Sequence, residues 1–548
     1  MRSSFFGLNV AATGLFTAQK ALDVVNHNLS NINTPGYSRQ QAVISASNPL
    51  SVYDGRGMVG TGSDVVSVQR VRDEYLDFKY WSEYTAQGEW EAKSEVLSDL
   101  EATFNEPSDS GFTTIMNDFY NSLQELAKDP GSGATRALVR ERGVTLAKYF
   151  NSTAVHLEKL QSDLNYRINT KVEEINSLGK QIQQLNRQIY TLELDGSKAN
   201  DLRDQRTLLV DKLSKLINID AGEVVTGKLP NGKDDKHFVI TISGKAFVDH
   251  FNFSELAVKE RDESHKLNAE DVDNLYEVGW KDGNSLEVKS GELRGYLDMR
   301  DGNDGKTGLD GTTASPMYKG IPFYMNKLNE FVQTFAMSFN EGYSNLVRNS
   351  DGSVDTSGLV DGAGHADGYA LNSTADTPSG IRFFTFLGED GNPVSSSTLI
   401  NGETSVSGIV DRYKNITAKN LAVSSDVMTD YNAISTSGEA GMEGNIDTLN
   451  ALLKLRSDPH MFAEGTPEDF MKSLVATVGI DSQQAVRLSD NQQAIVKQID
   501  NRRLSDSGVS ADEEMANLVK FQHAYNASAK MITTMAEIYD TLINKLGV

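Results

Sequence analysis

The sequence of 548 residues has no cysteine and only 11 prolines. Without cysteine the chain has no disulfides, thiolate nucleophiles or thiolate metal ligands. This absence fixes no compartment, although it suits a chain that crosses unfolded into an oxidising space without forming crosslinks.

Long apolar runs are also missing. No stretch reaches the roughly 18 apolar residues that a membrane-spanning helix requires, so we expect no membrane insertion. The start of the chain, with Phe5 and Phe6, is apolar, but Asn9 and Thr13 interrupt any signal-peptide core. We therefore expect no cleaved signal peptide.

Basic residues are too few to attract a polyanion. The chain has 52 basic and 76 acidic residues, a formal charge of −24, so a nucleic-acid partner is not expected. The 8 histidines are scattered and none lies in an H-E-x-x-H motif, and no G-x-S-x-G motif is present. We expect no metal site, no cofactor and no enzymatic activity.

Heptad spacing dominates both ends of the chain instead. One row near the N-terminus is formed by Leu8, Leu15, Leu22 and Leu29, and a second row lies three residues after each, at Ala11, Ala18, Val25 and Ile32. Apolar residues at these two positions of a seven-residue repeat predict a coiled-coil helix.

The C-terminal segment has the same spacing. Its main row consists of Leu518, Tyr525, Ile532, Tyr539 and Leu546, and the expected companion row consists of Met515, Gln522, Ala529, Ala536 and Ile543. Ser510 and Glu513 have the spacing of a capping box, which predicts that this helix begins immediately after Ser510.

A comparison of the burial free energy with the cost of ordering the backbone indicates the role of the two ends. Burying a seam of four leucines gives on the order of 10 kcal/mol. Ordering about 29 residues of backbone costs roughly 30 kcal/mol before the helix hydrogen bonds are counted. We therefore predict that the two ends become rigid only when copies of the chain assemble, which multiplies the burial.

A proline–glycine turn follows the N-terminal helix. Pro35 and Gly36 are typical of the centre of a type II turn, which ends the helix and presents Tyr37 and Arg39. From the residues alone, a simple helix stop and a contact loop remain equally good interpretations.

The rest of the chain alternates between helical and strand patterns. The fold class predicted is α+β: an elongated multidomain protein with terminal coiled-coil helices, a long helical-bundle shaft and β-rich outer domains inserted in the middle. The longest helix is expected over residues 135–194, and both termini are expected at one end, with the β parts at the far end. The predicted domains are a terminal one (1–40 and 509–548), a helical shaft (41–220, 291–345 and 441–508) and β-rich outer parts (221–290 and 346–440).

Two terminal stretches resemble a known family. Residues 31–40 (NINTPGYSRQ) and 507–530 (SGVSADEEMANLVKFQHAYNASAK) closely resemble the axial proteins of the bacterial flagellum. Three internal stretches are similar to the hook-associated members of that family: residues 104–111 (FNEPSDSG), 201–206 (DLRDQR) and 291–300 (GELRGYLDMR).

The resemblance implies a structural role at the junction of hook and filament. It implies a homo-oligomeric ring with hook protein below it and the next hook-associated junction protein above it. Both heptad segments would pack in an inner tube, and the loop of Pro35, Gly36, Tyr37 and Arg39 would contact adjacent subunits. It also implies an extracellular location, export through the flagellar type III channel and a cytoplasmic chaperone at the C-terminal helix.

Three alternatives remain open. The chain could be another axial component, such as a hook or distal-rod protein, although the helix over 135–194 argues against this. An outer domain could act as an adhesin, which is compatible with a structural role. A muramidase domain would need paired carboxylates in a cleft of a β-rich part.

Overall fold

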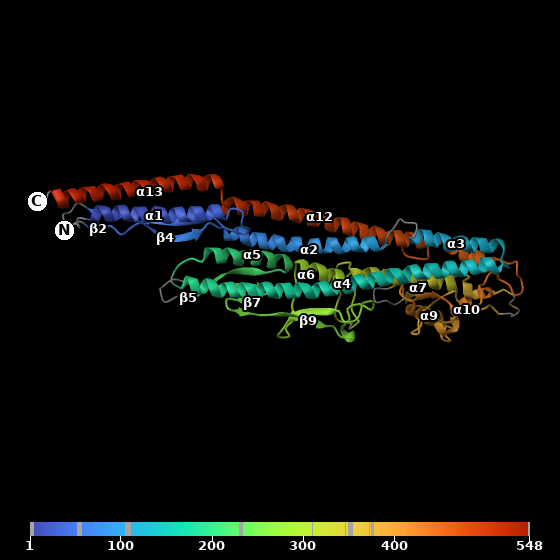
Figure 1. The fold of residues 1–548 in the computed structure, drawn as a ribbon. Helices are drawn as coiled ribbons and strands as arrows, with labels where there is room; N and C mark the ends of the chain where they lie inside the picture. The colour runs from blue at the N-terminus through green and yellow to red at the C-terminus, as the bar shows by residue number, and fades with distance from the viewer. Residues whose placement is uncertain are drawn as a thin grey trace.

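The computed structural model describes residues 5–51, 57–104, 111–194, 196–228, 234–309, 311–345, 347–348, 354–371, 373 and 377–545. The molecule is long and narrow, and α1 begins at the same tip at which α13 ends (Figure 1). The prediction that both termini lie at one end is confirmed.

Two antiparallel helices form this tip, α1 (Phe6–Ser30) and α13 (Ala511–Asp540), and a π-helical turn, η5 (Thr541–Lys545), follows α13. Strands β1 (Gln40–Ala46) and β4 (Ser63–Arg70) pair antiparallel and pack against α1. The short pair of β2 (Leu50–Ser51) and β3 (Met58–Val59) adjoins them in the chain. Strands β1 and β4 therefore lie with the terminal helices, although the predicted division put almost all of their residues in the shaft.

The shaft is a bundle of long helices. Helix α4 (Gly133–Glu193) has 61 residues and is about 90 Å long, which confirms the long helix predicted over 135–194. It packs against α3 (Phe112–Lys128), α5 (Asn200–Leu216), α6 (Glu292–Asp301) and α7 (Ile321–Glu341). Helix α2 (Glu74–Phe104) pairs with α12 (Pro467–Ser507), and α11 (Asp447–Leu455) packs on α3. Residues 105–110 of the FNEPSDSG stretch lie outside the described residues.

The first β-rich part lies along the C-terminal half of α4, not at the far end of the shaft as predicted (Figure 1). Its four-stranded sheet runs in the order β5 (Asp220–Lys228), β6 (Asp234–Ile242), β7 (Lys245–Asp249) and β8 (Asn252–Phe253). A second antiparallel pair is formed by β9 (Leu256–Glu260) and β10 (Tyr276–Trp280), with η1 (Glu263–His265) between them. The sheet rests on Gly179, where a Cβ atom would lie only 2.5 Å from Phe253 and 2.6 Å from Phe247.

The region 346–440 lies at the far end of the shaft and has less strand than the predicted β-rich domain (Figure 1). Its serines cap short helices instead: Ser395, Ser405 and Ser424 each accept a backbone N–H. The helices are α8 (Ser396–Ile400), α9 (Val406–Arg412), α10 (Ser425–Thr429), η2 (His365–Asp367), η3 (Tyr413–Asn415) and η4 (Tyr431–Ala433). The strands here are β11 (Tyr343–Ser344), β12 (Val347–Arg348), β13 (Val354–Asp355), β14 (Val360–Asp361), β15 (Phe384–Phe386) and β16 (Leu421–Val423).

Candidate assembly site

The face of α1 that meets α13 is lined by small residues. A Cβ atom added to Gly7 would lie 2.8 Å from Cε of Met535, and one added to Gly14 would lie 3.1 Å from Oγ of Ser528. At the tip the rings of Phe5 and Tyr539 are 5.1 Å apart. The two helices therefore approach closely, and their contact depends on side chains that bury little apolar area.

The predicted seam residues divide into two groups. On α1 the row of small residues, Ala11, Ala18 and Val25, is buried, whereas Ile32 is 40% exposed. The leucine row is only partly buried in the single chain: Leu8, Leu15, Leu22 and Leu29. On α13 the main row is likewise partly buried: Leu518, Tyr525, Ile532 and Tyr539. Leu546 lies outside the described residues.

The expected companion row on α13 is largely exposed in the single chain. Met515 is 57% exposed and Ile543 is 66% exposed, and Gln522 and Ala536 are also exposed. The contacts of Gly7 and Gly14 are instead with Met535 and Ser528, which lie three residues after Ile532 and Tyr525. Because the glycines leave room for these side chains, α13 turns this side of its main row toward α1.

Several large apolar side chains of α1, α13 and η5 are largely exposed within the single chain. They are Phe16, Met515, Val519, Met531, Ile538, Leu542 and Ile543, each between 45% and 66% exposed. We call them the uncovered terminal residues. A concentration of exposed apolar side chains on two paired helices is typical of an interaction surface.

The loop after α1 is the predicted type II turn. The amide of Tyr37 donates to the carbonyl of Thr34 at 3.2 Å, and Gly36 has a φ of +77°, which glycine adopts without strain. Pro35 and Gly36 are exposed.

Tyr37 and Arg39 contact partners within their own chain. The hydroxyl of Tyr37 donates to Oδ1 of Asn28 at 2.8 Å and lies 2.9 Å from Nδ1 of His27. Burial, together with nearby carboxylates, raises the pKa of Tyr37, so its hydroxyl keeps its proton. The loop was expected to contact adjacent subunits, but the side chains of Tyr37 and Arg39 make their hydrogen bonds and ion pairs within the same chain.

Asn28 connects α1, the loop and α13. Its Oδ1 accepts the amide of Gln40 at 2.9 Å, and its Nδ2 donates to the carbonyl of Gln40 at 2.8 Å and to Glu514 at 3.2 Å. The side chain is fully buried with every polar group satisfied. Asn28 therefore ties the end of α1 to the first residue of β1 and to the start of α13.

Arg39 joins the loop to the start of α13. Its guanidinium lies 2.8 Å from Glu513 and 2.8 Å from Glu514, and its amide donates to the carbonyl of Ser507 at 2.8 Å. Ser510 accepts the amide of Glu513 at 3.5 Å, which is the predicted cap. The reciprocal half of the capping box does not form, because the carboxylate of Glu513 pairs with Arg39 instead.

The meeting point of Asn28, Arg39 and Glu514 is called the joint below. A second set of contacts fixes this joint to the shaft. Asp204 of α5 accepts the amide of Ser38 at 2.7 Å and its hydroxyl at 2.8 Å, and it pairs with Arg70 at 3.0 Å. Asp201 accepts Nε2 of Gln40 at 2.6 Å. The sequence reasoning did not identify these residues as part of the site. The signal was present, since both aspartates lie in the DLRDQR stretch.

A groove of about 630 Å³ adjoins the joint. Its walls include exposed apolar residues of three segments, Ile32, Pro35 and Leu504, and two partly buried aromatic residues of α2, Tyr80 and Tyr84. The joint therefore carries its own partly apolar recess beside the uncovered terminal residues.

None of the described histidine, aspartate and glutamate side chains form a group of three that could hold a metal ion. No described helix is long and apolar enough to cross a membrane.

Three family descriptions match different parts of the chain. Residues 97–352 match the family described as "Flagellar hook-associated protein FlgK helical domain". The ends match families described as "Flagella basal body rod protein" (8–37) and "Flagellar basal body rod FlgEFG protein C-terminal" (501–546). The terminal helices are thus of a kind shared with rod proteins, whereas the shaft matches hook-associated proteins.

Curated relatives match over nearly the whole length. Flagellar hook-associated protein 1 of Bacillus subtilis (strain 168) is 30% identical, covering 100% of this chain and 99% of its own. The proteins of the same name from Escherichia coli (strain K12) and Salmonella typhimurium (strain LT2) are 27% and 26% identical, each covering 98% of this chain and 99% of its own. A solved structure, the flagellar hook junction protein FlgK from Burkholderia pseudomallei, is 14% identical, covers 80% of this chain and 100% of its own, and has a TM-score of 0.49. On the strength of the sequence relatives, the chain belongs to the flagellar hook-associated protein 1 family and is a structural protein of the flagellum.

Proposed function

We propose that this protein joins hook to filament by self-assembly of its terminal helices into a ring. The observation that carries the proposal is the poor burial of the terminal pair within one chain. Among the described residues of α13, only Glu514 is buried, and the six buried residues of α1 include three alanines and two polar residues. Such a pair buries too little apolar area to offset its ordering cost.

The exposed surface of the terminal pair could supply the additional apolar burial that the pair needs. The uncovered terminal residues and the half-buried leucine row would become buried if α1 and α13 packed between copies, and each copy would contribute the same surfaces. The groove beside Pro35 would receive part of a neighbouring copy, which leaves Pro35 and Gly36 as the part of the loop available for subunit contact. The seam and loop residues predicted from sequence thus belong to one assembly site.

The partners proposed are hook protein on one side of the ring and another hook-associated junction protein on the other. The names of the relatives support a place on the hook. Before assembly, the exposed apolar residues of α13 need a cover, and we assign this to a cytoplasmic chaperone. Export through the flagellar channel without a cleaved signal agrees with a chain that has no cysteine.

Deletion of residues 1–32 tests the proposal in cells that lack the native protein. The truncated chain should leave hooks in place but support no filament, because half of the terminal pair is missing. The double variant Val519→Lys/Ile538→Lys should have the same effect while the shaft stays folded, as judged by circular dichroism.

A matched control is Tyr166→Lys on α4, where Tyr166 is 71% exposed but far from the terminal pair. This variant should support normal filaments. Growth of filaments on hooks with the 1–32 deletion would overturn the proposed function.

A further inference from the structure

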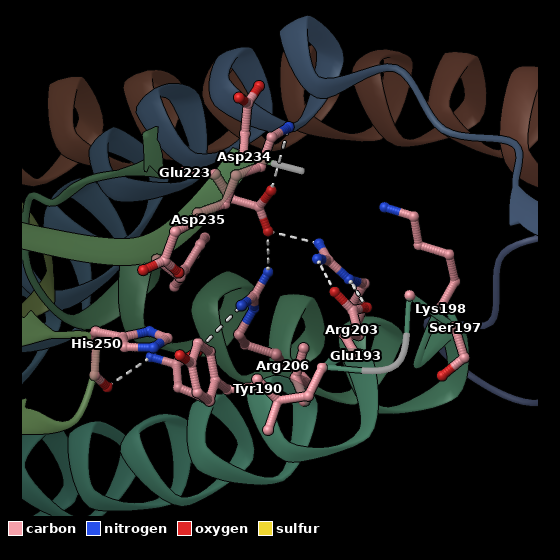
Figure 2. A pocket seen from close by; sticks show the side chains of 16 residues that line it. Tyr190, Glu193, Ser197, Lys198, Arg203, Arg206, Glu223, Asp234, Asp235 and His250 are labelled. Atoms are coloured by element: carbon pink, nitrogen blue, oxygen red, sulfur yellow. Dashed lines mark hydrogen bonds and ion pairs between the residues drawn. The ribbon is translucent and has the colours of Figure 1, made fainter. Parts of the chain in front are cut away.

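The shaft and the terminal pair differ in what they offer to a partner. In the polar cavity between α4, α5 and the four-stranded sheet, Arg203 lies 2.7 Å from Glu193, and Arg206 lies 3.1 Å from Glu223 (Figure 2). These charges are already paired within the chain. The terminal pair instead leaves large apolar side chains exposed, which is the stronger sign of a contact with another molecule.

Helix α13 has a second apolar row beside the one that meets α1. Ser528 and Met535, seven residues apart, contact the two glycines of α1. Three residues after each lie Met531 and Ile538, which are 51% and 45% exposed, and the exposed Ala524 continues this row toward the N-terminus of α13. Residues three apart occupy neighbouring stripes of a helix. The row of Ala524, Met531 and Ile538, here named the ridge row, is therefore continuous with the α1–α13 interface but lies outside it.

The pair also has a leucine face. Leu8, Leu15 and Leu22 of α1 are only partly buried in the single chain, and beside them on α13 lie the partly buried Ala529 and the exposed Ala536. These five residues, named the leucine face, carry no charge. They form a second uncharged surface on the terminal pair.

The ridge row and the leucine face lie on opposite sides of the pair. Both helices are right-handed and they run antiparallel, so the row three residues after a contact residue lies on the same side of the pair in each helix. On α1 this row includes Thr17, whose hydroxyl donates to the carbonyl of Ser63 in β4 at 2.9 Å. On α13 it is the ridge row. The leucines follow the α1 glycines by one residue instead, which places them around the other side of α1.

The spacing of the two surfaces is complementary. Gly7 lies opposite Met535. Counting forward along α1 and back along α13 from this contact, the leucines stand level with residues 520, 527 and 534, in the order Leu22, Leu15 and Leu8. In a ring whose copies stand at one height, Ala524 and Met531 of one copy would lie between successive leucines of the next copy. Apolar side chains alternate in this way where the knobs of one helix enter the holes of another.

The charges beside the two surfaces have opposite signs. Lys520 is exposed one turn before Ala524, beside the ridge row, and Asp23 is exposed next to Leu22, beside the leucine face. By the same count along the helices, Asp23 stands level with residue 519. A lysine of one copy would therefore face an aspartate of the next, which favours this contact over a contact between like surfaces.

We propose that successive copies of the chain pack head to tail, with the ridge row of one copy between the leucines of the next. This inference rests on the proposed function, because it names the surfaces through which the terminal helices assemble. Since the two surfaces differ, each copy uses one to bind the copy before it and the other to bind the copy after it, and the series closes as a ring.

Disulfide crosslinking tests the proposal, because the native chain has no cysteine. Gln19→Cys lies on the leucine face, four residues after Leu15, and Ala524→Cys lies on the ridge row, and both native residues are exposed. The two variants, carrying different tags, are produced together in cells that lack the native protein, and their flagella are oxidised with copper phenanthroline. We expect a disulfide-linked dimer with one copy of each variant. It should be at least about tenfold more abundant than dimers from either variant alone, since a fixed contact gives a high effective concentration.

A second pair, Ala12→Cys with Met531→Cys, tests the same contact nearer the tip, and either pair suffices if the other supports no filaments. Tyr166→Cys mixed with Ala524→Cys is the matched control, because Tyr166 is exposed on the shaft. This mixture should give no mixed dimer.

Dimers formed by Ala524→Cys alone, as abundant as those of the mixture, would show that like surfaces meet and would overturn the inference. Absence of mixed dimers with both pairs would overturn it as well. Filaments on the hooks of these cells would leave the proposed function standing in both cases, since that function is tested by the deletion of residues 1–32.

Discussion

Glu513 and Glu514 both pair with Arg39, but the side chain of Glu514 is 2% exposed and that of Glu513 is 62% exposed. Breaking a buried pair leaves an uncompensated charge, whereas an exposed pair contributes little. Glu514→Ala should therefore destabilise the joint by about 3 kcal/mol, and Glu513→Ala by less than about 1 kcal/mol. Amide exchange at Gln40, whose N–H donates to Asn28, measures both effects. Equal effects of the two variants would contradict this account of the joint.

Gly14 tests how closely the terminal helices approach. Gly14→Ala should be nearly neutral, because the Cβ atom needs only a small shift of Ser528 and alanine favours the helix by about 1 kcal/mol. Gly14→Leu should separate the helices at a cost of about 1–3 kcal/mol, as overpacking does, and reduce filament formation. The measurement is the fraction of cells with filaments, and a fully active leucine variant would show that this contact is not used in the assembly.

The residue scale is also where the sequence was least informative. The heptad rows gave the correct terminal helices. They contain the leucines and omit Gly7 and Gly14, although these two glycines form the close contact with α13 in the single chain. Asp204 was not identified because its contacts with Ser38 and Arg70 join segments more than a hundred residues apart. No local spacing encodes such a contact.

Among the elements, η2 contains the clearest pH-sensitive group. Nδ1 of His365 lies 2.7 Å from the carbonyl of Ile381, and its Nε2 accepts the amide of Ser435 at 2.9 Å, so the folded state requires neutral imidazole. Burial lowers the pKa of His365 from 6.5 to about 4. Its contribution to stability is therefore complete above pH 6.5 and is lost as the pH falls toward 4, by about 3 kcal/mol in all.

Denaturant unfolding at pH 7.5 and pH 4 measures this loss. His365→Gln should be less stable than the native chain at pH 7.5 but should lose less stability on acidification, because glutamine does not titrate. His265→Gln, at an exposed position of η1, should leave the pH dependence unchanged. Identical pH dependence in the native chain and His365→Gln would contradict the assignment.

At this scale the sequence predicted helices well and short strands poorly. Heptad repeats over Ile168, Ile175 and Ile182 extend through α4, and these side chains are buried. In the described part of region 346–440 the buried apolar residues follow neither period over a long stretch, and local serine caps begin several of the short helices. The helix starts there follow from side-chain hydrogen bonds that the overall composition does not reveal.

On the scale of the whole molecule, the position of the two ends follows from the order of long helices, and the sequence predicted it. The position of the sheet along the C-terminal half of α4 did not follow, because it depends on Gly179 making room for Phe247 and Phe253. The joint at Asn28, Arg39 and Glu514 then divides the terminal pair into a fixed part beside the shaft and a weakly buried part beyond it. Under the proposed function, the rigidity of the outer part comes from neighbouring copies.

Amide hydrogen exchange of the dilute single chain, compared with the assembled protein, tests this claim most directly. In the dilute chain the amides of residues 6–25 and 518–540 should exchange nearly as fast as in an unfolded peptide, while those of α4 stay protected. In the assembled protein the same terminal amides should become protected. Protection of both terminal segments in the dilute chain, as strong as that of α4, would contradict the account.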